Sequence, residues 1–232
     1  MTFAFPPAAQ PAVPIAGSDQ LFPVHRIYCV GQNYAAHAKE MGSSGREAPF
    51  FFSKPADAVV PVAPDTAGKM PYPTATQNLH HEIELVVAIG SAGKNIAASD
   101  AAAHIFGYAI GLDMTRRDLQ AEAKKAGRPW STAKGFDHSA PIGLIHPVNA
   151  IAALESTAAI TLLVNGVVRQ QGRLGDMIWN VTETIAYLST LFALEPGDLI
   201  FTGTPEGVGP VVRGDLMLGS IDGLGQLQVV VV

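Results

Sequence analysis

The sequence predicts an α+β protein that is mainly β, with packed or rolled sheets at the core and helices at the periphery. Many short apolar runs are separated by Gly, Pro and Asn, which is typical of strands and turns. Few stretches have a helical composition, and strands and helices do not alternate regularly. A chain of 232 residues is best interpreted as one domain. We expect a lead-in segment at residues 1–25 and a single large domain at residues 26–232.

The first half of the chain is divided by glycines and prolines. Apolar runs predict strands at residues 26–30, 50–52, 81–89 and 106–112. Helical composition predicts helices at residues 34–41, 101–104 and 115–127. Residues 59–76 contain several prolines and glycines and predict loop and turn.

The second half contains the strongest local signal. Asn165-Gly166 joins two apolar runs, residues 160–164 and 167–170, and this dipeptide favours a tight β-hairpin. A helix is predicted from Asn180 or Thr182 to Ala193. Further strands are predicted at residues 199–202, 215–218 and 227–232.

Composition narrows the class of protein. Only 15% of the residues are charged, against about a quarter in typical domains, which favours buried subunit contacts and a homo-oligomer. The net charge of −5 and the lack of basic clusters argue against nucleic-acid binding. We expect no membrane span and no signal peptide. The single cysteine, Cys29, lies in an apolar run, which indicates a buried thiol in a reducing cytoplasm.

Three carboxylates are candidate metal ligands. Glu82 and Glu84 are two residues apart on a predicted strand, so their side chains share one face. Their neighbours are apolar, and a divalent cation would offset both burial and mutual repulsion. Asp113 closes the next apolar strand and could supply a third oxygen, which suits Mg²⁺, with Mn²⁺ or Ca²⁺ possible. On spacing alone, a solvent-facing edge strand is the stronger interpretation of Glu82 and Glu84.

Histidines near these residues have separate interpretations. His80 and His81 are adjacent on a strand and point to opposite faces, so a shared metal is not expected. His37 and Glu40 are three apart on a predicted helix, where a carboxylate can orient an imidazole as a general base. An ordinary exposed ion pair is the alternative. The glycines that follow would let this helix move as a lid.

Two further segments could contribute to a site. Lys134 lies among apolar and small residues and could stabilise an oxyanion, although a solvated loop lysine fits equally well. Residues 202–209 follow an apolar strand and include Gly203 and Thr204. Their backbone N–H groups could hold a carboxylate, and a plain turn is the alternative.

Taken together, seven motifs resemble the fumarylacetoacetate hydrolase family from about Arg26 to the C-terminus. They are GQNYAAHAKEMG, FFSKP, NLHHEIELVV, GYAIGLDMTRRDLQ, WSTAKGFD, LVNGVVRQQG and EPGDLIFTGTPEGVG. The stretches DMTRRDLQAEAKKAGRPW and AKGFDHSAP are most similar to the acylpyruvate hydrolase branch, especially the fumarylpyruvate hydrolases of gentisate-type aromatic degradation. One departure is Gln32, where many relatives carry Arg.

The resemblance implies a mixed β-roll, a homodimer and metal-dependent hydrolysis of a C–C bond in a 2,4-diketo acid. The metal would be held by the carboxylates of Glu82, Glu84 and Asp113. The implied roles of the other residues are water activation by His37 and Glu40, contact with the reacting oxygens by Lys134 and Gln120, and binding of the pyruvyl carboxylate by Thr204.

The expected substrate, 3-fumarylpyruvate, has a second carboxylate that the metal does not reach. Because Arg binds carboxylates bidentately, we expect Arg116, Arg117 or Arg46 to pair with it. Two rival functions stay open on the same sequence. One is an acylpyruvase or an oxaloacetate decarboxylase on the same scaffold, and the other is a non-catalytic metal-binding protein.

Overall fold

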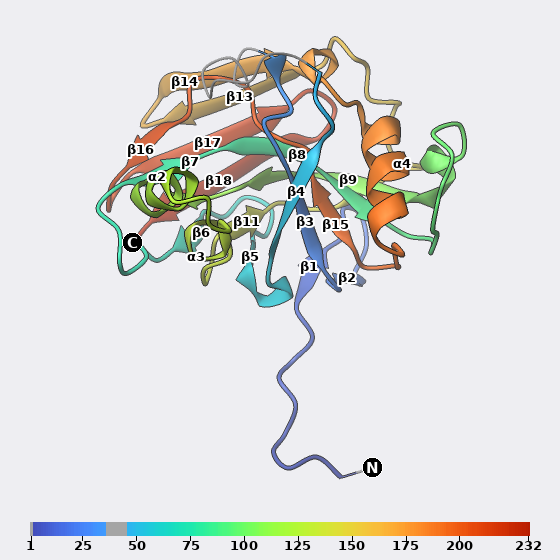
Figure 1. The fold of residues 1–232 in the computed structure, drawn as a ribbon, viewed down its shortest axis with the longest axis horizontal. Helices are drawn as coiled ribbons and strands as arrows, with labels where there is room; N and C mark the ends of the chain where they lie inside the picture. Colours follow the sequence, from blue (N-terminus) through green and yellow to red (C-terminus); the bar gives the residue numbers. More distant parts are fainter. Residues whose placement is uncertain (1, 36–45) are drawn as a thin grey trace.

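The computed structural model describes residues 2–35 and 46–232, and within these ranges the fold is mostly β with few helices (Figure 1). The strands are β1 (Ala12–Pro14), β2 (Leu21–Pro23), β3 (Ile27–Gly31), β4 (Phe50–Lys54), β5 (Val59–Pro61), β6 (Gly68–Met70), β7 (Leu79–His81), β8 (Ile83–Ile89), β9 (Ile105–Leu112), β10 (Thr115–Arg116), β11 (Ala140–Ile142), β12 (His146–Pro147), β13 (Ala159–Val164), β14 (Val167–Arg173), β15 (Leu199–Phe201), β16 (Gly209–Val211), β17 (Leu216–Ile221) and β18 (Gly225–Val231). The α-helices are α2 (Arg117–Lys125), α3 (Ser131–Lys134) and α4 (Val181–Leu191). Short 3₁₀ helices are η1 (Ala56–Ala58), η2 (Ala101–His104) and η3 (Leu174–Asp176).

The largest sheet runs in the order β4-β3-β15-β8-β9-β11-β5, with β12 paired to β9. Strand β8 lies in its middle and is buried along its whole length, since its neighbours cover both edges and other layers cover both faces. The sheet is mixed, because β15 pairs with β3 and β11 pairs with β5 in parallel, while the other neighbours are antiparallel.

A second sheet, in the order β14-β13-β17-β18-β6, packs against the first. The core between them includes Ile83 and Ile110 from the large sheet and Leu162, Met217 and Leu227 from the smaller one, all nearly fully buried. Their burial stabilises the roll, at about 1.5–3 kcal/mol for each large aliphatic side chain. The predicted mixed β-roll with peripheral helices is confirmed.

The opposite face of the large sheet has its own packing. Helix α4 covers one end of it, with Ile185 and Leu188 buried against Val87 and Ile200 (Figure 1). The helix begins where Asn180 accepts a hydrogen bond from the Glu183 backbone N–H, and the Glu183 carboxylate accepts one from the Asn180 N–H in return. This capping box decides between the two predicted starts in favour of Asn180.

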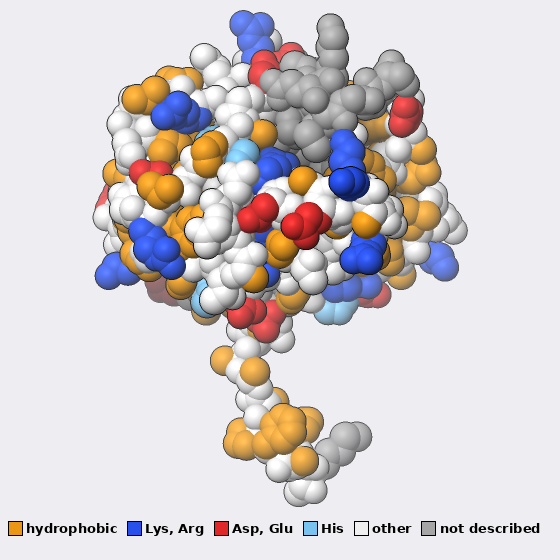
Figure 2. Space-filling model, turned by 60° about the vertical axis from the view of Figure 1, so that its left-hand side comes forward, with side chains coloured by type: hydrophobic (Ala, Val, Ile, Leu, Met, Phe, Trp, Pro, Cys, Tyr) orange, Lys and Arg blue, Asp and Glu red, His pale blue; other side chains and the backbone are white. Residues whose placement is uncertain are grey.

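The N-terminal residues divide into two parts. Strands β1 and β2 form an antiparallel pair whose Val13 and Phe22 are buried in the same cluster as Phe201 of β15. Residues before β1 extend away from the body of the protein, and Phe3 and Phe5 are 72% and 77% exposed. Figure 2 shows this hydrophobic extension, and it shows acidic and basic side chains interspersed over the drawn face of the main body.

Several predicted boundaries were wrong in informative ways. The strand predicted at residues 81–89 is broken at Glu82, because β7 leaves the large sheet to pair with β10 and β16. The helix predicted at 115–127 starts two residues later, since Thr115 and Arg116 pair with β7. Residues 59–76, predicted as loop, contain the short strands β5 and β6.

Other local predictions hold. The hairpin joins β13 and β14, and Asn165 and Gly166 both have positive φ, as a tight hairpin turn of this kind requires. The helix predicted at residues 34–41 falls mostly outside the described residues. Within the described ranges, no helix is long and apolar enough to cross a membrane.

Candidate active site

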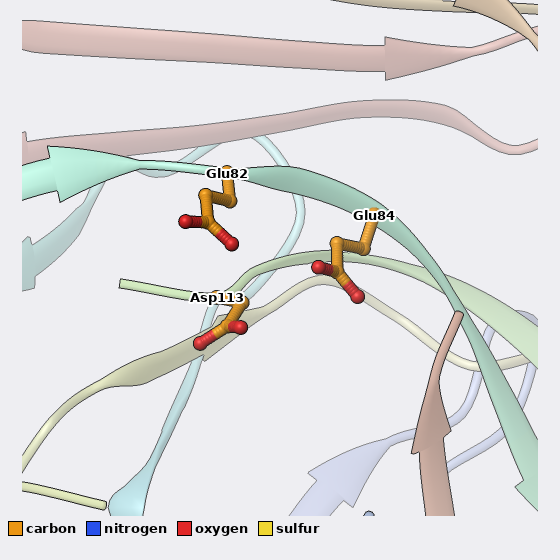
Figure 3. Close-up of side chains that lie close together, drawn as sticks. All are labelled: Glu82, Glu84 and Asp113. Carbon is orange, nitrogen blue, oxygen red and sulfur yellow. The ribbon is translucent and has the colours of Figure 1, made fainter. Parts of the chain in front are cut away.

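The three predicted metal ligands converge in the middle of the large sheet. Glu84 lies on β8, Glu82 lies at the break between β7 and β8, and Asp113 directly follows β9. The antiparallel register of β8 and β9 places Glu84 opposite Gly111, and the Asp113 N–H donates to the Glu82 carbonyl at 2.8 Å. Side-chain oxygens of all three lie within 4.8 Å of one another (Figure 3).

This cluster is buried, so the alternative of a solvent-facing edge strand is wrong. Glu82, Glu84 and Asp113 are 5%, 1% and 0% exposed. Burial, together with the charges of Asp113 and Glu82, raises the pKa of the Glu84 carboxyl well above its usual range. Among the described residues, the Gly203 backbone N–H donates a hydrogen bond to the Glu84 carboxylate at 2.8 Å. Three buried oxygen ligands that repel one another fit a hard divalent cation.

Lys134 is the central cation of the site. It ends helix α3, is 2% exposed, and its Nζ lies 2.8 Å from Glu82 Oε2 and 2.6 Å from Asp113 Oδ2. Burial works to lower its pKa, but Asp113 and Glu82 outweigh burial and hold the pKa above its ordinary value. Lys134 is therefore a buried cation, and the alternative of a solvated loop lysine is wrong.

Lys54 is a site residue that sequence reasoning missed. Its side chain at the end of β4 is fully buried, with Nζ 2.8 Å from Asp113 Oδ1. It also donates to the carbonyl oxygens of Met114 and Lys134, which ties β4 to the residue that precedes β10 and to the end of α3. The available signal was a lysine two residues after a run of three phenylalanines, since a lysine buried in so apolar a setting needs an anionic partner.

Arg117 opens helix α2 and is another cation of the site among the described residues. It donates to Glu82 Oε1 at 2.6 Å and to the side-chain oxygen of Gln120. Its Nε lies 3.3 Å from His80 Nδ1, and burial together with the Arg117 charge lowers the pKa of His80 to about 4. His80 is thus neutral at neutral pH. On the other face of β7, His81 Nδ1 donates to the side-chain oxygen of Gln170 at 2.9 Å.

The other two predicted arginines are engaged elsewhere. Arg116 donates to the Thr132 carbonyl, and its guanidinium lies 4.5 Å from the Phe136 ring centroid. Arg46 pairs with Glu183 at 2.6 Å and lies over the Trp179 ring.

The loop after β15 forms a third side of the site. The Thr204 hydroxyl donates to the Ile83 carbonyl at 2.7 Å and accepts from Gln170 Nε2 at 2.8 Å. The Gly203 backbone N–H donates to the Glu84 carboxylate, so this glycine contacts one of the predicted metal ligands directly. Its φ of 97° also places it where a side chain would be strained. Gln170 was not predicted as a site residue, although it lies in the motif LVNGVVRQQG that contributed to the family resemblance.

These side chains surround a narrow cavity of about 20 Å³. Its lining includes Gln32, Gln120, Lys134 and Thr204, together with Glu82, Glu84, Arg117, Phe52 and Trp130. Arg116 is not part of it. The predicted dyad of His37 and Glu40 lies outside the described residues. A larger cavity, of about 570 Å³, is lined by other residues, around Val62 to Thr66 and Leu224 to Gln228.

Over residues 26–232 the chain matches the family described as fumarylacetoacetate (FAA) hydrolase, C-terminal. The chain belongs to the fumarylacetoacetate hydrolase family. Among solved members, it is similar to fumarylpyruvate hydrolase from Pseudomonas aeruginosa, in complex with Mn²⁺ and pyruvate. That structure is 56% identical, covers 100% of this chain and 99% of its own, and has a TM-score of 0.97.

Curated family members with assigned activities are also similar. Fumarylpyruvate hydrolase from Ralstonia sp is 43% identical over 80% of this chain and 93% of its own length. Oxaloacetate tautomerase from Escherichia coli (strain K12) is 41% identical over 87% of this chain and 90% of its own length. The family thus includes at least two reactions of oxo acids on a closely related scaffold.

Proposed function

We propose that this protein hydrolyses 3-fumarylpyruvate to fumarate and pyruvate. The observation that carries the proposal is the buried cluster of Glu82, Glu84 and Asp113, faced by Lys134 and Arg117. It is supported by the 56% identity, over the whole chain, to a fumarylpyruvate hydrolase that binds Mn²⁺ and pyruvate, one of the two expected products.

The charges of the site suit a dianionic substrate. When all three carboxylates are ionised, as metal ligands are, their charges balance those of three described cations, Lys54, Lys134 and Arg117. A divalent ion held by the carboxylates brings the group to a net positive charge that matches the two carboxylates of fumarylpyruvate. We favour Mg²⁺, with Mn²⁺ and Ca²⁺ as alternatives that use the same ligands. When bound, the ion supplies Lewis-acid stabilisation of the negative charge on the departing pyruvyl group.

The protein's own residues divide the remaining work. His37, oriented by Glu40, takes a proton from the water that attacks the C4 carbonyl. Lys134, held as a buried cation, stabilises the negative charge that forms on the C4 oxygen. The C3–C4 bond then breaks, fumarate leaves with the water oxygen, and the proton returns to C3 to give pyruvate.

Gln120 and Thr204 position the pyruvyl end. Arg117 occupies the side-chain oxygen of Gln120, so the amide NH₂ is the group available to donate to a substrate oxygen. The Thr204 hydroxyl already has two partners, so its contribution to the pyruvyl carboxylate comes chiefly from its backbone N–H. Gln170 holds this loop in place by donating to both Thr204 and the Pro205 carbonyl.

The test is an assay of purified protein on fumarylpyruvate, maleylpyruvate and acetylpyruvate, with Mg²⁺, Mn²⁺ or EDTA. We expect stoichiometric fumarate and pyruvate, loss of activity in EDTA, and recovery when either metal is added in excess. Replacing His37 or Glu40 should lower kcat about 10²–10⁴-fold. Failure to form fumarate with either metal would refute the proposal.

A second candidate activity is oxaloacetate tautomerisation, which the 41% identity to the Escherichia coli enzyme favours. The same preparation is offered enolic oxaloacetate, and both keto product and CO₂ are followed. Tautomerisation without cleavage of fumarylpyruvate would make this the principal function. Release of CO₂ alone would instead indicate a decarboxylase.

The setting of the enzyme is also a proposal. The low share of charged residues supports a homodimer, and the single buried Cys29 supports a reducing cytoplasm. We place the reaction in gentisate-type aromatic degradation, where fumarylpyruvate is formed. Light scattering on the eluting protein tests the dimer, and a monomer mass at micromolar concentration would contradict it.

A further inference from the structure

A hollow of about 510 Å³ lies beside the narrow catalytic cavity. It is lined by Phe50 to Ser53 of β4 and by Arg128 to Ser131, the segment that joins α2 to α3. Phe52 and Trp130 line both the hollow and the catalytic cavity. Because the catalytic cavity holds only about 20 Å³, a seven-carbon substrate must reach into neighbouring space.

The shared wall is aromatic. The Trp130 ring packs edge-on against Phe50 at 5.4 Å and tilted against Phe52 at 5.9 Å, measured between centroids. On the catalytic side, Lys134 Nζ lies 5.0 Å from the centroid of Phe52. A planar, unsaturated acyl group can stack on such a surface. The wall shared by the catalytic cavity and the hollow, formed by Phe52 and Trp130, therefore suits a flat apolar chain.

Among the described residues that line this hollow, Arg128 is the one with a positively charged side chain. Gly127 follows the end of helix α2 and has a φ of 62°. The Arg128 backbone N–H donates to the Ala123 carbonyl at 2.8 Å, which fixes the backbone of Arg128 to the last turn of the helix. No described acidic group pairs with its guanidinium. By contrast, Arg46 and Arg117 have carboxylate partners, Glu183 and Glu82.

The neighbouring alternative is less suitable. A smaller space of about 60 Å³ also adjoins the catalytic cavity, sharing Gly31 and Gln32 with it. Its lining includes the acidic Glu47 and, among described residues, no Lys or Arg. This space is much smaller than the hollow of about 510 Å³, so the hollow is the more suitable place for the distal part of the substrate.

We propose that the hollow between β4 and Arg128–Ser131 is the subsite for the distal carboxylate of the substrate, with Arg128 as its specificity-determining cation and Trp130 as its stacking wall. This inference rests on the proposed hydrolysis of a dianionic diketo acid. It assigns the distal charge to a residue that is not engaged by the metal-site carboxylates, so substrate selection and metal binding use different arginines.

The experiment compares Arg128→Ala, Arg128→Lys and the wild type on fumarylpyruvate and on acetylpyruvate, which lacks the distal carboxylate. Arg213→Ala is the matched control, since Arg213 is an exposed arginine that packs on Tyr72, outside this lining. We expect Arg128→Ala to raise KM for fumarylpyruvate about tenfold, the low end for a charged hydrogen bond because Arg128 is exposed. KM for acetylpyruvate should not change. Arg128→Lys should fall between, because lysine keeps the charge but not the bidentate fork.

Fumarate binding, measured by titration calorimetry with Mn²⁺ present, separates this inference from the proposed function. If the wild type cleaves fumarylpyruvate but Arg128→Ala keeps the same preference and the same fumarate affinity, the subsite is refuted and the function stands. If no substrate is cleaved but fumarate binds and Arg128→Ala weakens it about tenfold, the subsite stands and the function fails. Equal changes in Arg128→Ala and Arg213→Ala would also overturn the subsite.

Discussion

Glu84 is a predicted metal ligand, yet its burial beside two other carboxylates destabilises the metal-free protein. Glu84→Gln should therefore raise stability without metal and abolish metal binding. Among the described residues, it is the carboxylate of the cluster without an ion pair, whereas Glu82 and Asp113 each contact two cations. Glutamine has nearly the same shape, and its side-chain oxygen can still accept from the Gly203 N–H. The substitution therefore removes a buried group that is costly to ionise beside Asp113 and Glu82, while keeping the packing.

The size of the effect follows from the geometry. Carboxylate oxygens within 4.8 Å of one another repel by about 3 kcal/mol for each pair at an effective dielectric constant of about 20. Lys134 offsets part of this repulsion for Glu84. We expect Glu84→Gln to raise the free energy of unfolding in EDTA by about 1–3 kcal/mol, or Tm by about 2–12 °C.

With metal, the sign should reverse. A divalent ion at a hundred times its Kd stabilises the wild type by about 2.7 kcal/mol, and the variant should lose most of this gain together with its activity. Calorimetry in EDTA and in excess Mn²⁺ measures both effects, with Glu155→Gln as an exposed control. A variant less stable than the wild type in EDTA, or one stabilised by Mn²⁺ as much as the wild type, would refute the reasoning.

Three other substitutions or treatments have defined outcomes. Lys54→Met leaves Asp113 short of one buried partner and should lower the free energy of unfolding by about 3–5 kcal/mol, which urea unfolding measures; a change below about 1 kcal/mol would contradict the pairing. Gln170→Leu removes the support of Thr204 and should speed hydrogen exchange in the 202–209 loop while raising KM, and unchanged exchange would exclude that support. Burial and the charge of Asp113 raise the pKa of the Cys29 thiol well above its usual range, so Ellman's reagent at pH 8 should label Cys29 only after unfolding; rapid labelling of folded protein would show that the thiol is accessible.

Local sequence signals were sufficient where the structure is decided by neighbours along the chain. The Asn165-Gly166 hairpin follows from backbone conformations that these two residues adopt at low cost. The apolar runs at residues 81–89 and 106–112 predicted strands that the fold contains as β8 and β9. These signals failed at Glu82 and at Thr115, where pairing of β7 with β10 overrides local preference.

The sequence by itself determined the residue types of the site: three carboxylates in apolar surroundings, a lysine in a small-residue segment, and a glycine-containing loop. The tertiary structure decided their electrostatics. Whether Glu82 and Glu84 faced water or the core depended on what packs on both faces of β8, which no spacing encodes. Strands β3, β15 and β8 separate β4 from β9 in the large sheet, so Lys54 became a partner of Asp113 only because the sheet curls and brings Lys54 Nζ to 2.8 Å from Asp113 Oδ1. Burial and cross-strand register are properties of the folded chain, and they turned a pattern of acidic residues into a candidate metal centre.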